Sequence, residues 1–90
     1  MKKTIQVTQA DIEKAKASEK PGLYRSCPIY FAIQREPELA GKYNVGSSFL
    51  YTSSRDISIN LPQEAARLSR LSYAQNWADV LPIIFEIELP

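Results

Sequence analysis

The sequence contains no histidine and a single cysteine, Cys27, among its 90 residues. Without histidine the chain lacks the usual general base and the commonest protein ligand of metal ions. One cysteine excludes an intrachain disulfide and a cysteine-rich metal site. The three glycines are isolated, so there is no glycine-rich loop for a phosphate group. These absences predict a protein without metal or cofactor that is not an enzyme.

Long apolar runs are also missing. No segment approaches the roughly 18 apolar residues that a membrane-spanning helix needs. Lys2 and Lys3 resemble the start of a signal peptide, but the residues from Thr4 to Gln9 do not form the apolar region that would follow. We therefore expect a cytoplasmic protein without membrane contact, in which the single thiol stays reduced.

The composition is that of one small folded domain, residues 1–90, with 44% apolar and 23% charged residues. Eleven basic and ten acidic side chains give a net charge of +1, which fits neither a strongly basic nucleic-acid-binding protein nor an acidic DNA mimic. The charges are nevertheless uneven. Residues 71–90 contain Asp79, Glu86 and Glu88 but no lysine or arginine.

Apolar periodicity predicts eight elements. In order, these are a strand over Thr4–Val7, helices over Gln9–Ser18 and Pro28–Glu36, strands over Tyr43–Val45, Phe49–Thr52 and Ile57–Ile59, a helix from Leu61 to about Gln75, and a strand over Ile83–Leu89. The order β-α-α-β-β-β-α-β predicts an α+β domain, in which about three helices pack on one face of an antiparallel sheet.

Local signals support these elements. Thr8 is a suitable N-cap, with Asp11 near the positive end of the first helix. Cys27 precedes a proline at the first position of the second helix. Phe49 and Phe85 are expected to be buried. The apolar stripe of the third helix comprises Leu61, Ala65, Leu68, Leu71 and Ser72, opposite the polar residues Gln63, Arg67 and Arg70.

Four segments carry a more specific pattern. They read Ile5-x-Val7-Thr8-x-x-x-Ile12, Cys27-Pro28-Ile29-x-x-Ala32-Ile33-x-Arg35, Leu61-Pro62-x-x-Ala65 and Val80-x-Pro82-x-x-Phe85-x-Ile87-x-Leu89. In these segments the chain resembles a group of short phage and prophage accessory proteins. The resemblance implies a small viral protein in the host cytoplasm. It also implies docking on a host protein or complex, for example as an anti-CRISPR-like or other inhibitor of an antiviral defence system.

Aromatic residues interleaved with basic ones suggest where such a partner binds. Tyrosine, tryptophan and arginine are enriched at the energetic centres of protein interfaces. The predicted contact residues are Tyr24, Arg25, Tyr43, Tyr51, Arg55 and Trp77. Because nucleic-acid binding depends on neutralising many phosphates, a net charge near zero favours a protein partner. Pairing of a sheet edge with a second copy of the chain, giving a homodimer, stays open.

Two alternatives remain. A small nucleic-acid-binding regulator would use the basic residues Lys14, Lys16, Lys20, Arg67 and Arg70. A minor enzyme would use Cys27 as a nucleophile, although no histidine is present to activate the thiol, and its position at a helix start favours a structural role. Glu86 and Glu88 are interpreted as the solvated face of the last strand, where charges prevent edge-to-edge pairing, instead of an acid/base pair or a metal site.

Overall fold

The computed structural model describes residues 1–18 and 27–90, and it confirms the α+β class and the predicted order of elements. Within those residues there is one additional short 3₁₀ helix, η2. The elements are β1 (Lys2–Val7), α1 (Gln9–Lys16), α2 (Pro28–Ile33), β2 (Tyr43–Val45), β3 (Phe49–Thr52), β4 (Ser58–Asn60), α3 (Gln63–Tyr73), η2 (Trp77–Asp79) and β5 (Ile83–Glu88).

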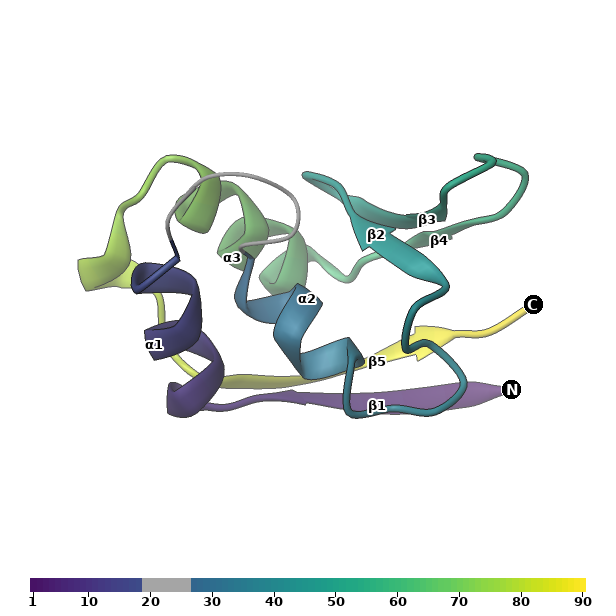
Figure 1. Cartoon of the computed structure of the whole chain (residues 1–90), viewed down its shortest axis with the longest axis horizontal. Coiled ribbons are helices and arrows are strands. Elements are labelled where there is room, and N and C mark those ends of the chain that lie inside the picture. The colour runs from purple at the N-terminus through teal and green to yellow at the C-terminus, as the bar shows by residue number, and fades with distance from the viewer. Residues whose placement is uncertain (19–26) are drawn as a thin grey trace.

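The strands are divided between two antiparallel sheets, where the sequence suggested one. β1 pairs with β5 along its whole length, from Lys2 opposite Glu88 to Val7 opposite Ile83. β2, β3 and β4 form a separate meander. β1 and β5 run side by side along one side of the molecule, and the helices lie over them (Figure 1). α2 packs on β1 and α3 packs on β5, so the helices cover one face of this sheet.

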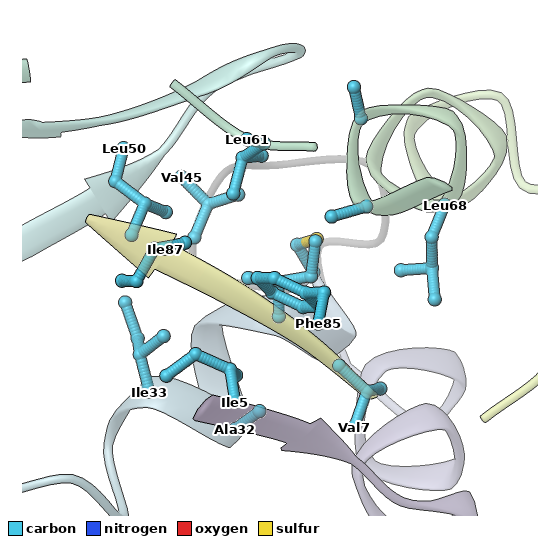
Figure 2. Packing of buried hydrophobic residues seen from close by; sticks show 14 of the residues in the cluster. Ile5, Val7, Ala32, Ile33, Val45, Leu50, Leu61, Leu68, Phe85 and Ile87 are labelled. Atoms are coloured by element: carbon cyan, nitrogen blue, oxygen red, sulfur yellow. The ribbon is translucent and has the colours of Figure 1, made fainter. Parts of the chain in front are cut away.

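The hydrophobic core lies between the two sheets and the helices. Alternate residues of β1 and β5 point into it, because successive side chains of a strand face opposite sides of the sheet. Figure 2 shows side chains from both sheets and from α2 and α3 converging around Phe85. The fully buried contributors with large side chains include Ile5, Ile12, Ile29, Ile33, Leu39 and Leu50.

The stripe predicted for the third helix is largely confirmed. Ala65, Leu68 and Ser72 are buried, and Leu71 is partly buried against the core. The predicted burial of Phe49 is wrong, because 39% of its surface is exposed. Its neighbour Leu50 occupies the core-facing position of β3 and is completely buried. The alternation of the strand therefore directs Phe49 to the outer face of the meander.

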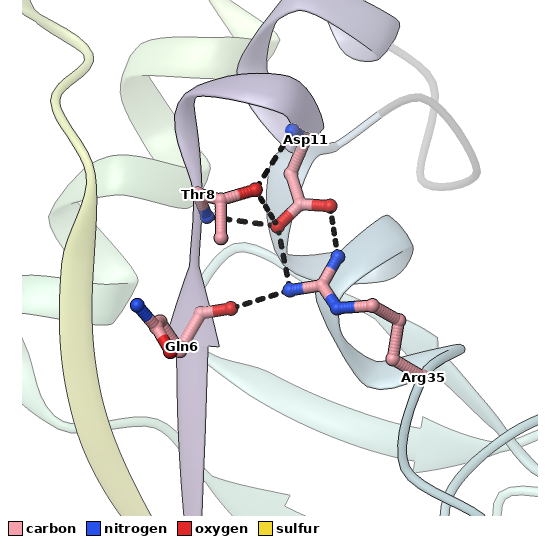
Figure 3. Close-up of polar contacts among 4 residues, drawn as sticks. All are labelled: Gln6, Thr8, Asp11 and Arg35. Atoms are coloured by element: carbon pink, nitrogen blue, oxygen red, sulfur yellow. Dashed lines mark hydrogen bonds and ion pairs between the residues drawn. The ribbon is translucent and has the colours of Figure 1, made fainter.

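A polar cluster ties α1 to β1 and to the segment after α2 (Figure 3). Thr8 is the N-cap of α1: its hydroxyl accepts the amide of Asp11 at 3.3 Å, and its own amide donates to the Asp11 carboxylate at 2.8 Å. Both oxygens of that carboxylate accept the guanidinium of Arg35, whose Nη2 also donates to the carbonyl of Gln6 at 2.7 Å. The predicted cap is therefore confirmed as a capping box.

Asp11 is the buried charge of this cluster, with only 1% of its surface exposed. Burial by itself raises the pKa of the Asp11 carboxyl, but the hydrogen bonds from Arg35 and Thr8 together outweigh it and hold the pKa below its ordinary value. The carboxylate is thus kept ionised inside the fold by the cation of Arg35. Among the helices of the described ranges, none has the length and apolar character needed to cross a lipid bilayer.

Candidate functional site

The outer face of the meander presents Phe49, Tyr51 and Arg55 together, here named the aromatic cluster. The ring centroids of Phe49 and Tyr51 are 5.7 Å apart, with their planes inclined at 54°. The Arg55 guanidinium lies 5.5 Å from the centroid of the Tyr51 ring, within the range of a cation–π interaction. Two aromatic side chains and one cation therefore meet on a single exposed surface.

The turn between β3 and β4 places Arg55 over Tyr51. The amide of Arg55 donates to the carbonyl of Thr52 at 2.8 Å, and the amide of Thr52 donates to the carbonyl of Ile57 at 3.0 Å. Arg55 itself adopts a φ of 64°, an uncommon conformation for a residue other than glycine. These bonds close the turn tightly and fix where the arginine side chain leaves the backbone.

An open hollow of about 440 Å³ lies within this surface. Its lining residues are Gly46, Ser47, Phe49, Tyr51, Arg55 and Ser58. Glycine is favoured at position 46 because a Cβ there would lie only 3.1 Å from the Phe49 carbonyl oxygen and would also contact the phenyl ring at 3.5 Å. Aromatic rings, two serine hydroxyl groups and a guanidinium suit an apolar side chain that has a carboxylate beside it.

The structure brings together two of the predicted contact residues, Tyr51 and Arg55. Tyr43, also predicted as a contact residue, does not join them, because it is only 9% exposed and belongs to the core cluster. The register explains this: Tyr43 lies opposite Thr52, whereas Tyr51 lies opposite Asn44, so the two tyrosines face opposite sides of the sheet. Tyr24 and Arg25 lie outside the described residues.

Trp77 does not join the aromatic cluster. It lies in η2, at the other end of the molecule from β3 (Figure 1), and is half-buried against the core. Phe49, which was expected to be buried, belongs to the cluster instead. The sequence signal for this is strand alternation: in a short strand, Phe49 and its neighbour Leu50 must face opposite sides, so only one of them can be in the core.

Two basic residues of the nucleic-acid alternative, Lys16 and Arg67, have acidic neighbours. Lys16 pairs with Glu13 at 3.5 Å on the exposed side of α1. Arg67 lines a small hollow together with Glu64 and Asp79. Of the remaining candidates, Lys14 and Arg70 are exposed, and Lys20 lies outside the described residues. Acidic groups at two of these places reduce the positive potential that phosphate binding needs.

Cys27 is packed inside the core, as expected for a structural residue. Only 1% of its surface is exposed, and its Sγ lies 3.9 Å from the hydroxyl oxygen of Ser69. Burial raises the pKa of the Cys27 thiol, with nearby hydroxyl and backbone hydrogen bonds opposing this in part. A buried thiol with a raised pKa is a poor nucleophile, because the thiolate is the reactive form.

Glu86 and Glu88 are exposed on the outer face of β5, where they alternate with the buried residues Phe85 and Ile87. This confirms their assignment to the solvated face of the strand. In residues 1–18 and 27–90 there is no group of three or more cysteine or acidic side chains that could hold a metal ion.

No protein-family model, no curated protein and no solved structure matches this chain.

Proposed function

We propose that this chain is a small phage-type accessory protein that binds a host protein or protein complex, such as an inhibitor of an antiviral defence system. The observation that supports binding is the aromatic cluster, in which the exposed Phe49 lies beside the partly exposed Tyr51 and the Arg55 guanidinium lies over the Tyr51 ring. Such residues supply large contact areas at protein interfaces. The phage setting rests on the resemblance of the four sequence segments.

The chemistry of the hollow favours a protein partner over a nucleic acid. Among the described residues that line it, Arg55 is the only basic one, whereas affinity for nucleic acids comes mainly from contacts to several phosphates. One aromatic or aliphatic side chain could fill the space between Phe49 and Tyr51, with a neighbouring carboxylate on Arg55. The predicted partner surface is therefore apolar with an acidic edge.

Affinity capture from host lysate, with and without nuclease, provides the first test. We expect a protein partner whose recovery does not depend on nucleic acid. Titration of that partner should then show that Tyr51→Ala and Phe49→Ala each weaken binding by about 2 kcal/mol, roughly 30-fold. Tyr30→Ala is the matched control, because Tyr30 is a half-exposed tyrosine of α2 outside the aromatic cluster.

The Arg67→Glu/Arg70→Glu double variant separates the two binding hypotheses. If a protein is the partner, this variant binds like the wild type. Loss of binding in this variant, together with a steep dependence on salt and loss of the partner after nuclease, would instead show a nucleic-acid-binding regulator.

The biological part of the proposal requires a cellular test. In a host that restricts a phage through a defence system, expression of the wild-type chain should raise the efficiency of plating. Tyr51→Ala should not raise it, whereas Tyr30→Ala should. Equal plating with the wild type and Tyr51→Ala would contradict the role of the aromatic cluster.

A further inference from the structure

One edge of β5 pairs with β1, and the other edge faces away from it. At the end of this sheet the amide of Leu89 donates to the carbonyl of Met1 at 2.8 Å, and the amine of Met1 approaches the carbonyl of Leu89 at 3.5 Å. In an antiparallel sheet, opposed residues alternate between pairs that exchange hydrogen bonds and pairs that do not. Because Met1 and Leu89 form a hydrogen-bonded pair, the pairs that contain Glu88, Glu86 and Ile84 are not hydrogen-bonded. The amides and carbonyls of these three residues therefore point away from β1.

β1 provides an independent check on this alternation. Gln6 lies opposite Ile84, and its carbonyl indeed points outward, where it accepts the Arg35 guanidinium at 2.7 Å. The outer edge of β1 is thus partly closed by a side chain. On β5 the situation differs: no backbone or side-chain partner from residues 1–18 and 27–90 reaches the main-chain groups of Ile84, Glu86 or Glu88.

A small groove accompanies the open edge. A hollow of about 140 Å³ lies between α3 and the start of β5, and none of its lining residues belongs to β1. Its apolar walls come from Leu68 and Leu71 of α3, Leu81 and Ile83. Leu81 and Ile84 are 66% and 64% exposed, which is high for large apolar side chains. A strand laid along this edge would direct every second side chain toward α3.

The groove and the middle of this edge carry more acidic than basic groups. Glu64 and Asp79 line the groove with Arg67, and Glu86 lies on the outer face opposite Thr4. Glu88 is exposed on the same face, but it lies opposite Lys2 and its carboxylate pairs with the amine of Met1 at 3.4 Å. A second copy of the chain is a poor occupant, because the full-length antiparallel register would place Glu86 opposite Glu86 of the copy. Like charges directly opposed across two strands are destabilising. Lysine or arginine in the same positions would be stabilising.

We propose that the open edge of β5 accepts an extended, basic segment of a partner protein as an additional strand. Its main chain pairs with Ile84, Glu86 and Glu88, and a basic side chain lies beside Glu86. An apolar side chain on its other face enters the groove between α3 and β5. Strand addition of this kind combines backbone hydrogen bonds for affinity with side-chain pockets for specificity. This surface is separate from the aromatic cluster.

The direct test uses a synthetic peptide of alternating lysine and valine and a matched peptide with glutamate in place of lysine. Amide hydrogen exchange is followed residue by residue by NMR in the full chain. The lysine peptide should slow exchange at Ile84, Glu86 and Glu88, while Phe85 and Ile87, already bonded to β1, stay protected. The glutamate peptide should have no effect, and added salt should weaken the lysine peptide.

Glu86→Pro tests the hydrogen bonding itself. Proline removes the outward amide of residue 86 and leaves the bonds between β1 and β5, a position where a strand tolerates proline. We expect at least a tenfold loss of peptide affinity, about the effect of one lost hydrogen bond. Thr4→Pro is the matched control, because Thr4 holds the equivalent outward position on β1, and it should leave binding unchanged.

A charge reversal, Glu86→Lys/Glu88→Lys, keeps the test valid should Glu86→Pro fail to fold. This variant should prefer the glutamate peptide. Three results would overturn the proposal: equal binding of both peptides, binding of the lysine peptide without protection of the three amides, or dimerisation of the chain that protects the same amides. None of these results bears on Tyr51, so the proposed function is tested separately.

Discussion

Phe85 in the β1–β5 sheet is 4% exposed, whereas Phe49 in the meander is 39% exposed. Both phenylalanines lie in antiparallel strands, yet one is surrounded by core side chains and the other forms part of an open hollow. The difference arises from the face of the sheet that each residue occupies: Phe85 is on the core-facing side of β5, whereas Phe49 is on the outer side of β3, next to the buried Leu50. Both sheets thus contribute their inner faces to the core, and the outer face of the meander presents aromatic rings to solvent.

The largest loss of stability is expected from Phe85→Ala, with Phe49→Ala as its comparison. Phe85→Ala should lower the free energy of unfolding by about 3–5 kcal/mol, because it leaves a cavity in the core. For a domain of 90 residues the whole free energy of unfolding is only about 5–13 kcal/mol. Phe49→Ala should cost less than about 1 kcal/mol. Urea denaturation of both variants measures this difference, and similar losses would show that the outer face of the meander is also packed.

Arg35→Ala should have the next largest effect on stability. It leaves the buried Asp11 carboxylate without its cation, and breaking a buried ion pair is strongly destabilising. Since Arg35 itself is 47% exposed, we expect a loss of about 2–3 kcal/mol. Lys3→Ala is the control: Lys3 bridges Glu36 and Glu38 at 2.8 and 3.2 Å near the surface, and it should cost less. A loss with Lys3→Ala as large as that with Arg35→Ala would contradict this ranking.

The pH dependence of the Arg35 effect is a smaller and more specific prediction. The pKa of Asp11 is lower in the folded state than its ordinary value of 3.8, so on acidification the unfolded state binds the proton first. The stability that the ionised Asp11 contributes is therefore lost as the pH falls from 3.8 through the folded pKa. Without Arg35, burial should raise that pKa instead. The stability difference between wild type and Arg35→Ala should therefore narrow between pH 7 and pH 3. A constant difference would mean that Arg35 acts through packing alone.

Cys27→Ser should have the smallest effect. The hydroxyl replaces a buried thiol beside Ser69, so a cost of about 1 kcal/mol is expected in thermal melting. Partner binding should be unchanged, since Cys27 is remote from solvent. A folded Cys27→Ser protein that no longer binds would restore the hypothesis of a reactive thiol.

Local signals in the sequence were sufficient for most of the secondary structure. The limits of β2 and β3 match the predicted Tyr43–Val45 and Phe49–Thr52, and the cap formed by Thr8 and Asp11 lies within one turn of chain. Strand pairing is different, because alternation shows that a strand has two faces but not which strand lies beside it. The separation into two sheets therefore could not be predicted. Nor could the contact between Asp11 and Arg35, which are 24 positions apart.

The same limit applies to the candidate site. Tyr51 and Arg55 are joined by a short turn, so their proximity could be inferred locally. Whether Tyr43 shares their face depends on the register between β2 and β3, which places it on the opposite side. Hydrophobicity alone assigned Phe49 to the core, although only one of two adjacent residues in a strand can face it.

The pairing of β1 with β5 also bears on how quickly the protein folds. Met1 and Leu89, whose main chains meet in this sheet, are 88 positions apart, whereas the meander and α3 form within short stretches of sequence. Closing so long a loop lowers the chain entropy before the contacts of the sheet can form. A fold with many such distant contacts, that is, with a high contact order, therefore folds slowly. We therefore expect slower folding than in a helical domain of equal length, with the β3–β4 turn and its aromatic rings in place before the β1–β5 sheet closes.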